Sequence, residues 1–222
     1  MSAPRGLLLD FGSVVSVSLF ERHAQTERQL GLAPQSLTWR GALDPETDTL
    51  WQAMLRDEIS ERDYWARRAG ELGAAVGESG WDMATLLARI RPADPRTVVR
   101  PVMRSLIGAA RRRGLRLGIL SNELELFYGA DFLAGVGLRE LFDAVIDATH
   151  THILKPDARA YALALAALQL PAGEVLFVDD QFRNIAGAVR AGLQTQLFDL
   201  RDVPGNIAAV AARLQLAPGE YL

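Results

Sequence analysis

Short apolar runs bounded by turn or polar residues are the clearest pattern in the chain. Four such runs stand out, and a weaker fifth lies between the second and the third: Leu7–Phe11, Leu115–Leu120, Val175–Val178, Thr195–Phe198 and, as the weaker run, Ala144–Ile146. Their length and composition are typical of buried strands. Helical patterns separate the later runs, which predicts parallel strands joined by crossover helices. The pattern therefore predicts an α/β fold, a doubly wound, Rossmann-like parallel sheet.

Helix signals in this part of the chain agree with that prediction. Pro101 stands where a first helical residue belongs, and Gly114 follows the arginines that end the same apolar periodicity. By the same reasoning, Pro156 is expected to open a helix and Asn206 to cap the closing one.

Between the first run and the second, the strand pattern disappears. Helices are expected around Glu21–Leu30 and Thr49–Arg56, then after a Ser60 cap and after a Ser79 cap. This region holds all four tryptophans, which are Trp39, Trp51, Trp65 and Trp81. Bulky aromatic side chains dominate burial, so we expect them to fill a helical core rather than to bind a ligand. Residues 1–15 and 96–222 are thus predicted to form an α/β core, and residues 16–95 a helical cap domain over the end of the first strand.

Composition excludes several classes of function. The 222 residues carry 24 Lys and Arg against 27 Asp and Glu, so a net charge of −3 predicts neither a nucleic-acid partner nor an anionic membrane partner. The absence of cysteine excludes disulfides, cysteine-bound zinc and a cysteine nucleophile. No apolar run has the length of a secretory signal or a membrane span, and we expect a cytoplasmic protein. Composition gives no prediction of oligomeric state.

Polar side chains gather at the predicted carboxyl ends of the strands, where parallel α/β sheets bind ligands. These residues are Asp10, Ser121, Asn122, Lys155, Asp179 and Asp180. Each alone is explained by a turn, a helix cap or a solvated position. Three carboxylates, a hydroxyl and an ammonium at one sheet edge are harder to explain in that way. The set therefore indicates a site.

Phosphoryl transfer suits this combination of groups. Asp10 and Asp180 offer the oxygen ligands that Mg²⁺ prefers, and Asp179 can act directly or through a water. Lys155 can offset the charge of a phosphate whose oxygens the Ser121 hydroxyl binds. A carboxylate can attack phosphorus, and Asp10 is the natural nucleophile of an aspartyl-phosphate pathway.

The segments DFGSV, LSN, KPDARAY and FVDDQFRNIAGA, in this order, resemble the four motifs of the haloacid dehalogenase superfamily. The resemblance implies that Asp10 is nucleophile and metal ligand and that the Gly12 carbonyl also binds the metal. It implies phosphate binding by Ser121, with Asn122 beside it in the substrate site, and charge neutralisation by Lys155. It further implies metal-site roles for Asp179 and Asp180, and an orienting role for Asn184.

The chain departs from most phosphatases of this superfamily at Gly12. Those enzymes carry an aspartate there that protonates the leaving oxygen, a role worth about 10² to 10⁴-fold in rate. The Asp-x-Gly-x-Val form resembles a branch that includes α-glucose-1-phosphate phosphatases and the phosphatase-like domains of epoxide hydrolases, which share KP-x-AR-x-Y and a segment similar to RDEISERDYW. His150 and His152 are expected to be solvated loop residues, and His23 an ordinary helix position.

Three interpretations follow. The first is a Mg²⁺-dependent phosphatase acting on a small phosphorylated metabolite, such as a sugar phosphate. The second is a 2-haloacid dehalogenase using Asp10, although its relatives typically have an aromatic residue at the Gly12 position and lack the paired acids. The third is a catalytically impaired binding protein, which only Gly12 supports.

Overall fold

The computed structural model describes residues 3–222 and divides into two compact units. The core unit contains the chain up to Val17 together with Asp94–Leu222, and the inserted unit is Ser18–Ala93. Among the described helices, none combines the length and apolar character needed to cross a membrane.

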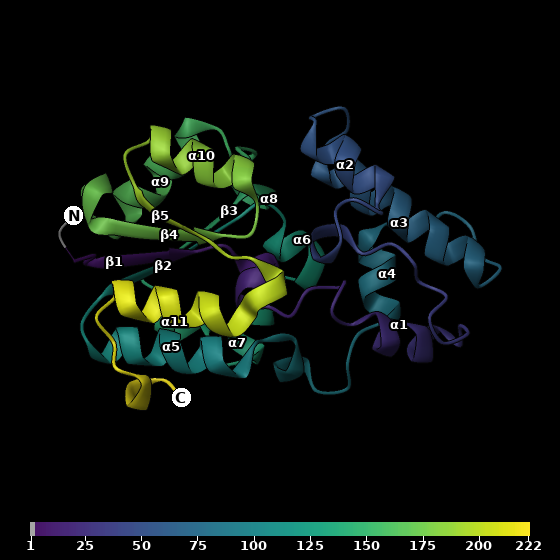
Figure 1. Cartoon of the computed structure of the whole chain (residues 1–222), viewed down its shortest axis with the longest axis horizontal. Helices are drawn as coiled ribbons and strands as arrows, with labels where there is room; N and C mark the ends of the chain where they lie inside the picture. The colour runs from purple at the N-terminus through teal and green to yellow at the C-terminus, as the bar shows by residue number, and fades with distance from the viewer. Residues whose placement is uncertain (1–2) are drawn as a thin grey trace. The chain divides into compact units, whose positions relative to one another are not determined.

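A five-stranded, wholly parallel sheet forms the centre of the core unit, in the order β3-β2-β1-β4-β5 (Figure 1). The strands are β1 Gly6–Leu9, β2 Arg116–Ser121, β3 Ala144–Asp147, β4 Val175–Asp179 and β5 Gln194–Leu197. Every residue of β1 and β4 is buried, as expected of central strands covered on both faces. The predicted α/β class with a parallel sheet is therefore confirmed.

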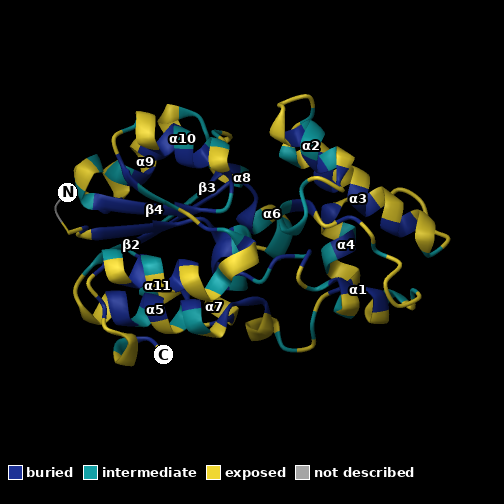
Figure 2. Cartoon of the chain, in the orientation of Figure 1, coloured by how far each residue is buried: buried dark blue, intermediate teal, exposed yellow. Residues whose placement is uncertain are grey.

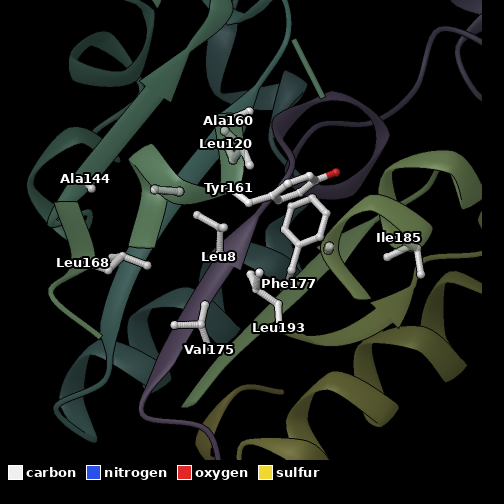
Figure 3. Packing of buried hydrophobic residues seen from close by; sticks show 12 residues of the cluster. Leu8, Leu120, Ala144, Ala160, Tyr161, Leu168, Val175, Phe177, Ile185 and Leu193 are labelled. Atoms are coloured by element: carbon white, nitrogen blue, oxygen red, sulfur yellow. The ribbon is translucent and has the colours of Figure 1, made fainter. Parts of the chain in front are cut away.

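Helices cover both faces of this sheet. Figure 1 shows α9 and α10 on one face and α5 and α11 on the other. Their bounds are α5 Pro101–Arg112, α9 Ala158–Leu168, α10 Phe182–Arg190 and α11 Val203–Arg213. Each turns buried residues to the sheet and exposed residues outward (Figure 2). Leu8 of β1 and Phe177 of β4 pack with Tyr161 of α9 in the hydrophobic cluster of one face (Figure 3).

Three shorter helices lie beyond the carboxyl ends of β2 and β3. They are α6 Leu124–Tyr128, α7 Phe132–Gly135 and α8 Ala148–Thr151. Because β1, β2, β3 and β4 are parallel and in register, their carboxyl ends reach one edge of the sheet. That edge holds the candidate site.

Two core helices are capped by aspartates and not by the residues that the sequence predicted. The helix expected at Pro156 begins at Ala158, and the Asp157 side chain accepts a hydrogen bond from the Arg159 amide. The closing helix begins at Val203, where Asp202 accepts from the Gly205 amide. Carboxylates are strong N-caps and take these positions. Asn206, the expected cap, lies inside the helix and donates to the Asp199 and Asp202 carbonyls.

The inserted unit is helical, as its sequence pattern predicts. Its helices are α1 His23–Leu30, α2 Thr49–Leu55, α3 Glu61–Ala75 and α4 Met83–Arg89. Ser60 forms the expected cap of α3, as a capping box with Asp63. The expected Ser79 cap is wrong, because the Asp82 carboxylate accepts from the Thr85 amide and starts α4 three residues later.

Aromatic rings fill the centre of the inserted unit. The Phe20 ring centroid lies 5.8 Å from Trp39 and 5.3 Å from both Trp51 and Trp65. Trp81 is also buried, against Gly73 of α3. The expectation that the tryptophans fill a helical core is confirmed.

Candidate active site

Lys155 joins two strand ends at the carboxyl edge of the sheet. Its ammonium nitrogen lies 2.7 Å from Asp10 Oδ1, just after β1, and 2.7 Å from Asp179 Oδ2, at the end of β4. The three side chains are buried. Burial alone lowers the pKa of the Lys155 ammonium, but the two carboxylates outweigh burial and raise this pKa above its ordinary value. Lys155 therefore stays charged between the two side chains.

Asp179 is held in one orientation from its own side of the sheet. The Gln181 amide donates to Asp179 Oδ1 at 2.8 Å, and Asn184 Nδ2 lies 3.1 and 3.2 Å from its two carboxylate oxygens. Asn184 is in turn fixed by Tyr161, whose hydroxyl donates to the Asn184 carbonyl at 2.7 Å. Each Asp179 oxygen thus has partners that fix the carboxylate before any ligand binds.

Ser121 and Asn122 end β2 at the same edge, and both are buried. The Ser121 hydroxyl oxygen lies 3.4 Å from the Glu123 amide that donates to it. Asn122 holds the backbone of Lys155, accepting from its amide at 2.8 Å and donating to its carbonyl at 3.3 Å. The amide of Asn122 therefore positions the loop that delivers the lysine.

The loop after Asp10 is compact and packed. Phe11 forms edge-to-face contacts with Tyr128 and Phe132, at centroid distances of 5.2 and 5.7 Å. Gly12 has an ordinary extended backbone, with φ −60° and ψ 132°. A Cβ at Gly12 would meet only Asp10 Oδ2, at 3.8 Å. Neither backbone conformation nor crowding requires glycine here.

Three carboxylates form a group suited to a cation. Asp10, Asp179 and Asp180 each place an oxygen within 4.8 Å of the others, with Asp180 the most exposed of the three. Carboxylate oxygens are the ligands that hard divalent cations prefer. The residues present therefore fit such a cation.

The histidines take different positions. His150 lies in α8, with its side chain exposed and Nε2 2.5 Å from Glu125 Oε2. His152 follows α8 and is exposed, as expected. His23 differs from its expected ordinary helix position because its ring is buried in the aromatic core, 4.3 Å from the Trp39 ring.

Arg100 and Gln181 contribute to this region and were missed by sequence reasoning. Gln181 directly follows the aspartate pair, and its contribution is a backbone amide, which residue type does not signal. Arg100 precedes Pro101 and contacts Ser13, 87 positions away in sequence. Because arginines often precede helices, the residue type at this position did not predict the contact.

The parallel α/β sheet, whose carboxyl edge unites an aspartate, a lysine and an aspartate pair, agrees with the hydrolase resemblance of the sequence motifs. The family comparison agrees, because the model of the haloacid dehalogenase-like hydrolases matches residues 6–192. The chain belongs to this hydrolase family.

Individual relatives carry different activities in their names. The chain is 30% identical over 207 residues to phosphoserine phosphatase from Thermus thermophilus, covering 88% of this chain and 81% of the relative. It is 38% identical over 85 residues to an (S)-2-haloacid dehalogenase from Pseudomonas, covering 38% and 36%. It spans less than half the length of several curated relatives that it matches.

A solved structure shares the fold. The HAD-hydrolase YfnB from Bacillus subtilis, determined with bound magnesium, matches with a TM-score of 0.69 at 19% identity, covering 97% of this chain and 100% of YfnB.

Proposed function

We propose that this hydrolase is a Mg²⁺-dependent phosphatase that cleaves a small phosphate monoester through an aspartyl-phosphate on Asp10, with a sugar phosphate as one candidate substrate. The observation that carries the proposal is the buried contact of Lys155 with both Asp10 and Asp179, beside the third carboxylate of Asp180. A lysine and a carboxylate cluster together can accept a dianionic phosphate with its cation, whereas either alone would leave a large uncompensated charge.

The residues have separate tasks in the proposed reaction. An Asp10 oxygen attacks phosphorus and forms the P–O bond of an aspartyl-phosphate, while the bond to the leaving oxygen breaks. Lys155 and the Ser121 hydroxyl bind phosphate oxygens. Water then attacks phosphorus and releases inorganic phosphate and the Asp10 carboxylate. Asn122 and Asn184 position Lys155 and Asp179.

Asp10, Asp179, Asp180 and the Gly12 carbonyl are the proposed metal ligands. Bound there, Mg²⁺ would supply positive charge to offset the charge of the reacting phosphate. The carboxylate group supports this assignment by its donor type and spacing. YfnB, which shares the fold, was determined with magnesium.

Gly12 narrows the proposed substrate class. With no acid at that position, the leaving oxygen must take its proton from water or another residue, or leave without one. Substrates with stabilised leaving groups are favoured, in agreement with the resemblance to α-glucose-1-phosphate phosphatases. We propose that residues 16–95 act as the cap domain that selects among them.

The test is phosphate release from p-nitrophenyl phosphate and from a panel of phosphorylated metabolites, with and without Mg²⁺. We expect metal-dependent release that Asp10→Asn lowers by at least about 10³-fold, since this substitution removes the nucleophile. Asp157→Asn is the matched control, because Asp157 caps α9 and asparagine caps helices equally well.

Other outcomes would identify the competing interpretations. Full activity without metal contradicts the proposal. Chloride release from 2-chloropropionate, without phosphate release, indicates a dehalogenase. Absence of both activities, with no binding of beryllium fluoride in the presence of Mg²⁺, indicates a binding protein.

A further inference from the structure

A buried arginine holds the loop that follows Asp10. Arg100, immediately before α5, is 5% exposed, and its Nε and Nη2 donate to the Ser13 carbonyl at 3.1 and 2.8 Å. Its guanidinium also lies over the Phe198 ring, 5.7 Å from the centroid. The planar guanidinium can direct two donors to one oxygen while its face packs on an aromatic ring. The ammonium of lysine cannot make this arrangement.

The carbonyl that Arg100 holds belongs to an unusual backbone position. Ser13 has φ 63° and ψ −26°, in the left-handed region that non-glycine residues seldom adopt. On its other side, the Ser13 amide donates to Ser16 Oγ at 3.1 Å. Residues in this region persist only where their surroundings hold them. Here the surroundings are Ser16 and Arg100.

The main chain of Arg100 is fixed as firmly as its side chain. Its amide donates to the Val15 carbonyl at 2.9 Å, and the Val17 amide donates to the Val98 carbonyl at 2.8 Å. Ser16 and Val99 form an antiparallel bridge between these bonds. The segment that leaves the core unit and the segment that returns to it are thus paired, and Arg100 extends this pairing to Ser13.

From these contacts we propose that Arg100 is a positioning residue for the nucleophile loop. By holding the Ser13 carbonyl, it fixes the turn that carries Asp10 and the Gly12 carbonyl in the arrangement that the metal and the phosphate require. Its role in turnover rests on the proposed function, whereas its hold on the loop does not. Partners that orient metal ligands typically change metal affinity or activity by about 10 to 100-fold when they are removed.

Arg100→Met keeps the apolar stem and removes both donors, and Arg100→Lys restores one charge-assisted donor. Arg104→Met is the matched control, because Arg104 lies one turn later on α5. Its two η nitrogens likewise donate to one carbonyl, that of Val136. Val136 follows α7, away from the Asp10 loop in sequence. The control therefore removes the same kind of contact without touching the nucleophile loop.

The first measurement is amide hydrogen exchange of residues 11–16 in the whole protein without metal. We expect exchange to rise about tenfold in Arg100→Met, to rise less in Arg100→Lys and to stay unchanged in Arg104→Met. The second is Mg²⁺ affinity by calorimetry, which we expect to fall about tenfold in Arg100→Met only. With p-nitrophenyl phosphate we expect kcat to fall by a similar factor, while KM stays within about twofold.

Unchanged exchange of residues 11–16 in Arg100→Met, or an equal rise in Arg104→Met, would overturn the proposal. If Arg100→Met does not fold, Arg100→Lys decides by the same comparison. A wild-type protein that releases no phosphate refutes the proposed function, and the exchange measurement still decides the role of Arg100.

Discussion

At the residue scale, Gly12 is the position where this site differs most from the phosphatase pattern. Its backbone is ordinary, and the space beside it is open apart from Asp10 Oδ2 at 3.8 Å. Glycine is therefore not required by local structure. A longer side chain would start next to Asp10, the proposed nucleophile.

Gly12→Asp is expected to retain Mg²⁺ binding and to raise kcat about tenfold or more on substrates with poor leaving groups, such as alkyl phosphates, because it supplies a general acid. The gain on p-nitrophenyl phosphate should be smaller, since its leaving group needs little protonation. Steady-state kinetics on both substrates measure the difference, with Gly12→Ala as the control for the added Cβ. A large loss on both would mean that the site depends on the glycine.

His23 is a residue whose pKa is changed by its buried surroundings. Both ring nitrogens are buried without a hydrogen-bond partner among the described residues. Burial, followed by the charge of Arg40, lowers the pKa of His23 to about 4 from the ordinary 6.5, although Glu27 and Asp48 act in the opposite direction. The folded protein therefore keeps this histidine neutral where an unfolded chain would protonate it.

The inserted unit is accordingly expected to be most stable above pH 6.5 and to lose stability as pH falls towards 4. Between these values the unfolded chain binds the extra proton, so acid favours unfolding, by roughly 3 kcal/mol in total. Urea titrations followed by tryptophan fluorescence report on this unit, because it contains all four tryptophans.

His23→Phe should flatten this pH dependence, whereas His152→Asn, at an exposed left-handed position, should leave it unchanged. An undiminished slope in His23→Phe would show that other groups cause it.

At the element scale, the close approach of α10 to the start of α9 positions Asn184. A Cβ at Gly187 of α10 would lie 2.8 Å from Pro156 Cβ and 2.8 Å from the Tyr161 hydroxyl oxygen. Only glycine permits this contact, which brings Tyr161 within hydrogen-bond distance of the Asn184 carbonyl. The packing of α10 against α9 therefore helps to position Asn184, which in turn contacts Asp179.

Gly187→Ala is expected to destabilise the core unit by about 1 to 3 kcal/mol, the usual cost of overpacking. Gly108→Ala in α5 is the control, because its Cβ would meet only the flexible end of Arg112 at 3.4 Å. The control should be neutral or gain up to about 1 kcal/mol from helix propensity. Urea unfolding followed by circular dichroism compares them, and equal effects would contradict the packing argument.

At the scale of the whole molecule, the parallel sheet brings distant parts of the chain to one edge. Lys155 lies 145 positions after Asp10 in sequence and 24 positions before Asp179, yet contacts both. At this edge Asp10, Asp179 and Asp180 also place three carboxylate groups close together. A cation that binds them should therefore stabilise the folded core unit.

Mg²⁺ at 100 times its Kd is expected to stabilise the core unit by about 2.7 kcal/mol, and chelation should remove this gain. Amide exchange of β1 and β4 measures the effect. Asp180→Asn should weaken it by removing a charged ligand, whereas Asp157→Asn, on the exposed surface near α9, should not. Equal stabilisation of wild type and Asp180→Asn would place the cation elsewhere.

Local sequence patterns were sufficient to predict the strands, the fold class and the residues at the strand ends. Strands appear as short apolar runs because both faces of the sheet are buried, and the carboxyl ends of parallel strands meet at one edge by geometry. The motif segments around Asp10, Ser121, Lys155 and Asp179 could be recognised because each is local. Helix starts were less predictable where two neighbouring residues both favour a start, as Pro156 and Asp157 do.

Which side-chain atoms come into contact became visible in the folded structure alone. It placed the Lys155 ammonium between two carboxylates, turned Asn122 towards the backbone of Lys155 and brought Arg100 to the Ser13 carbonyl. It also buried His23 among aromatic rings. These contacts join residues whose local patterns are ordinary. They depend on side-chain packing across the fold, which hydrophobic periodicity does not encode.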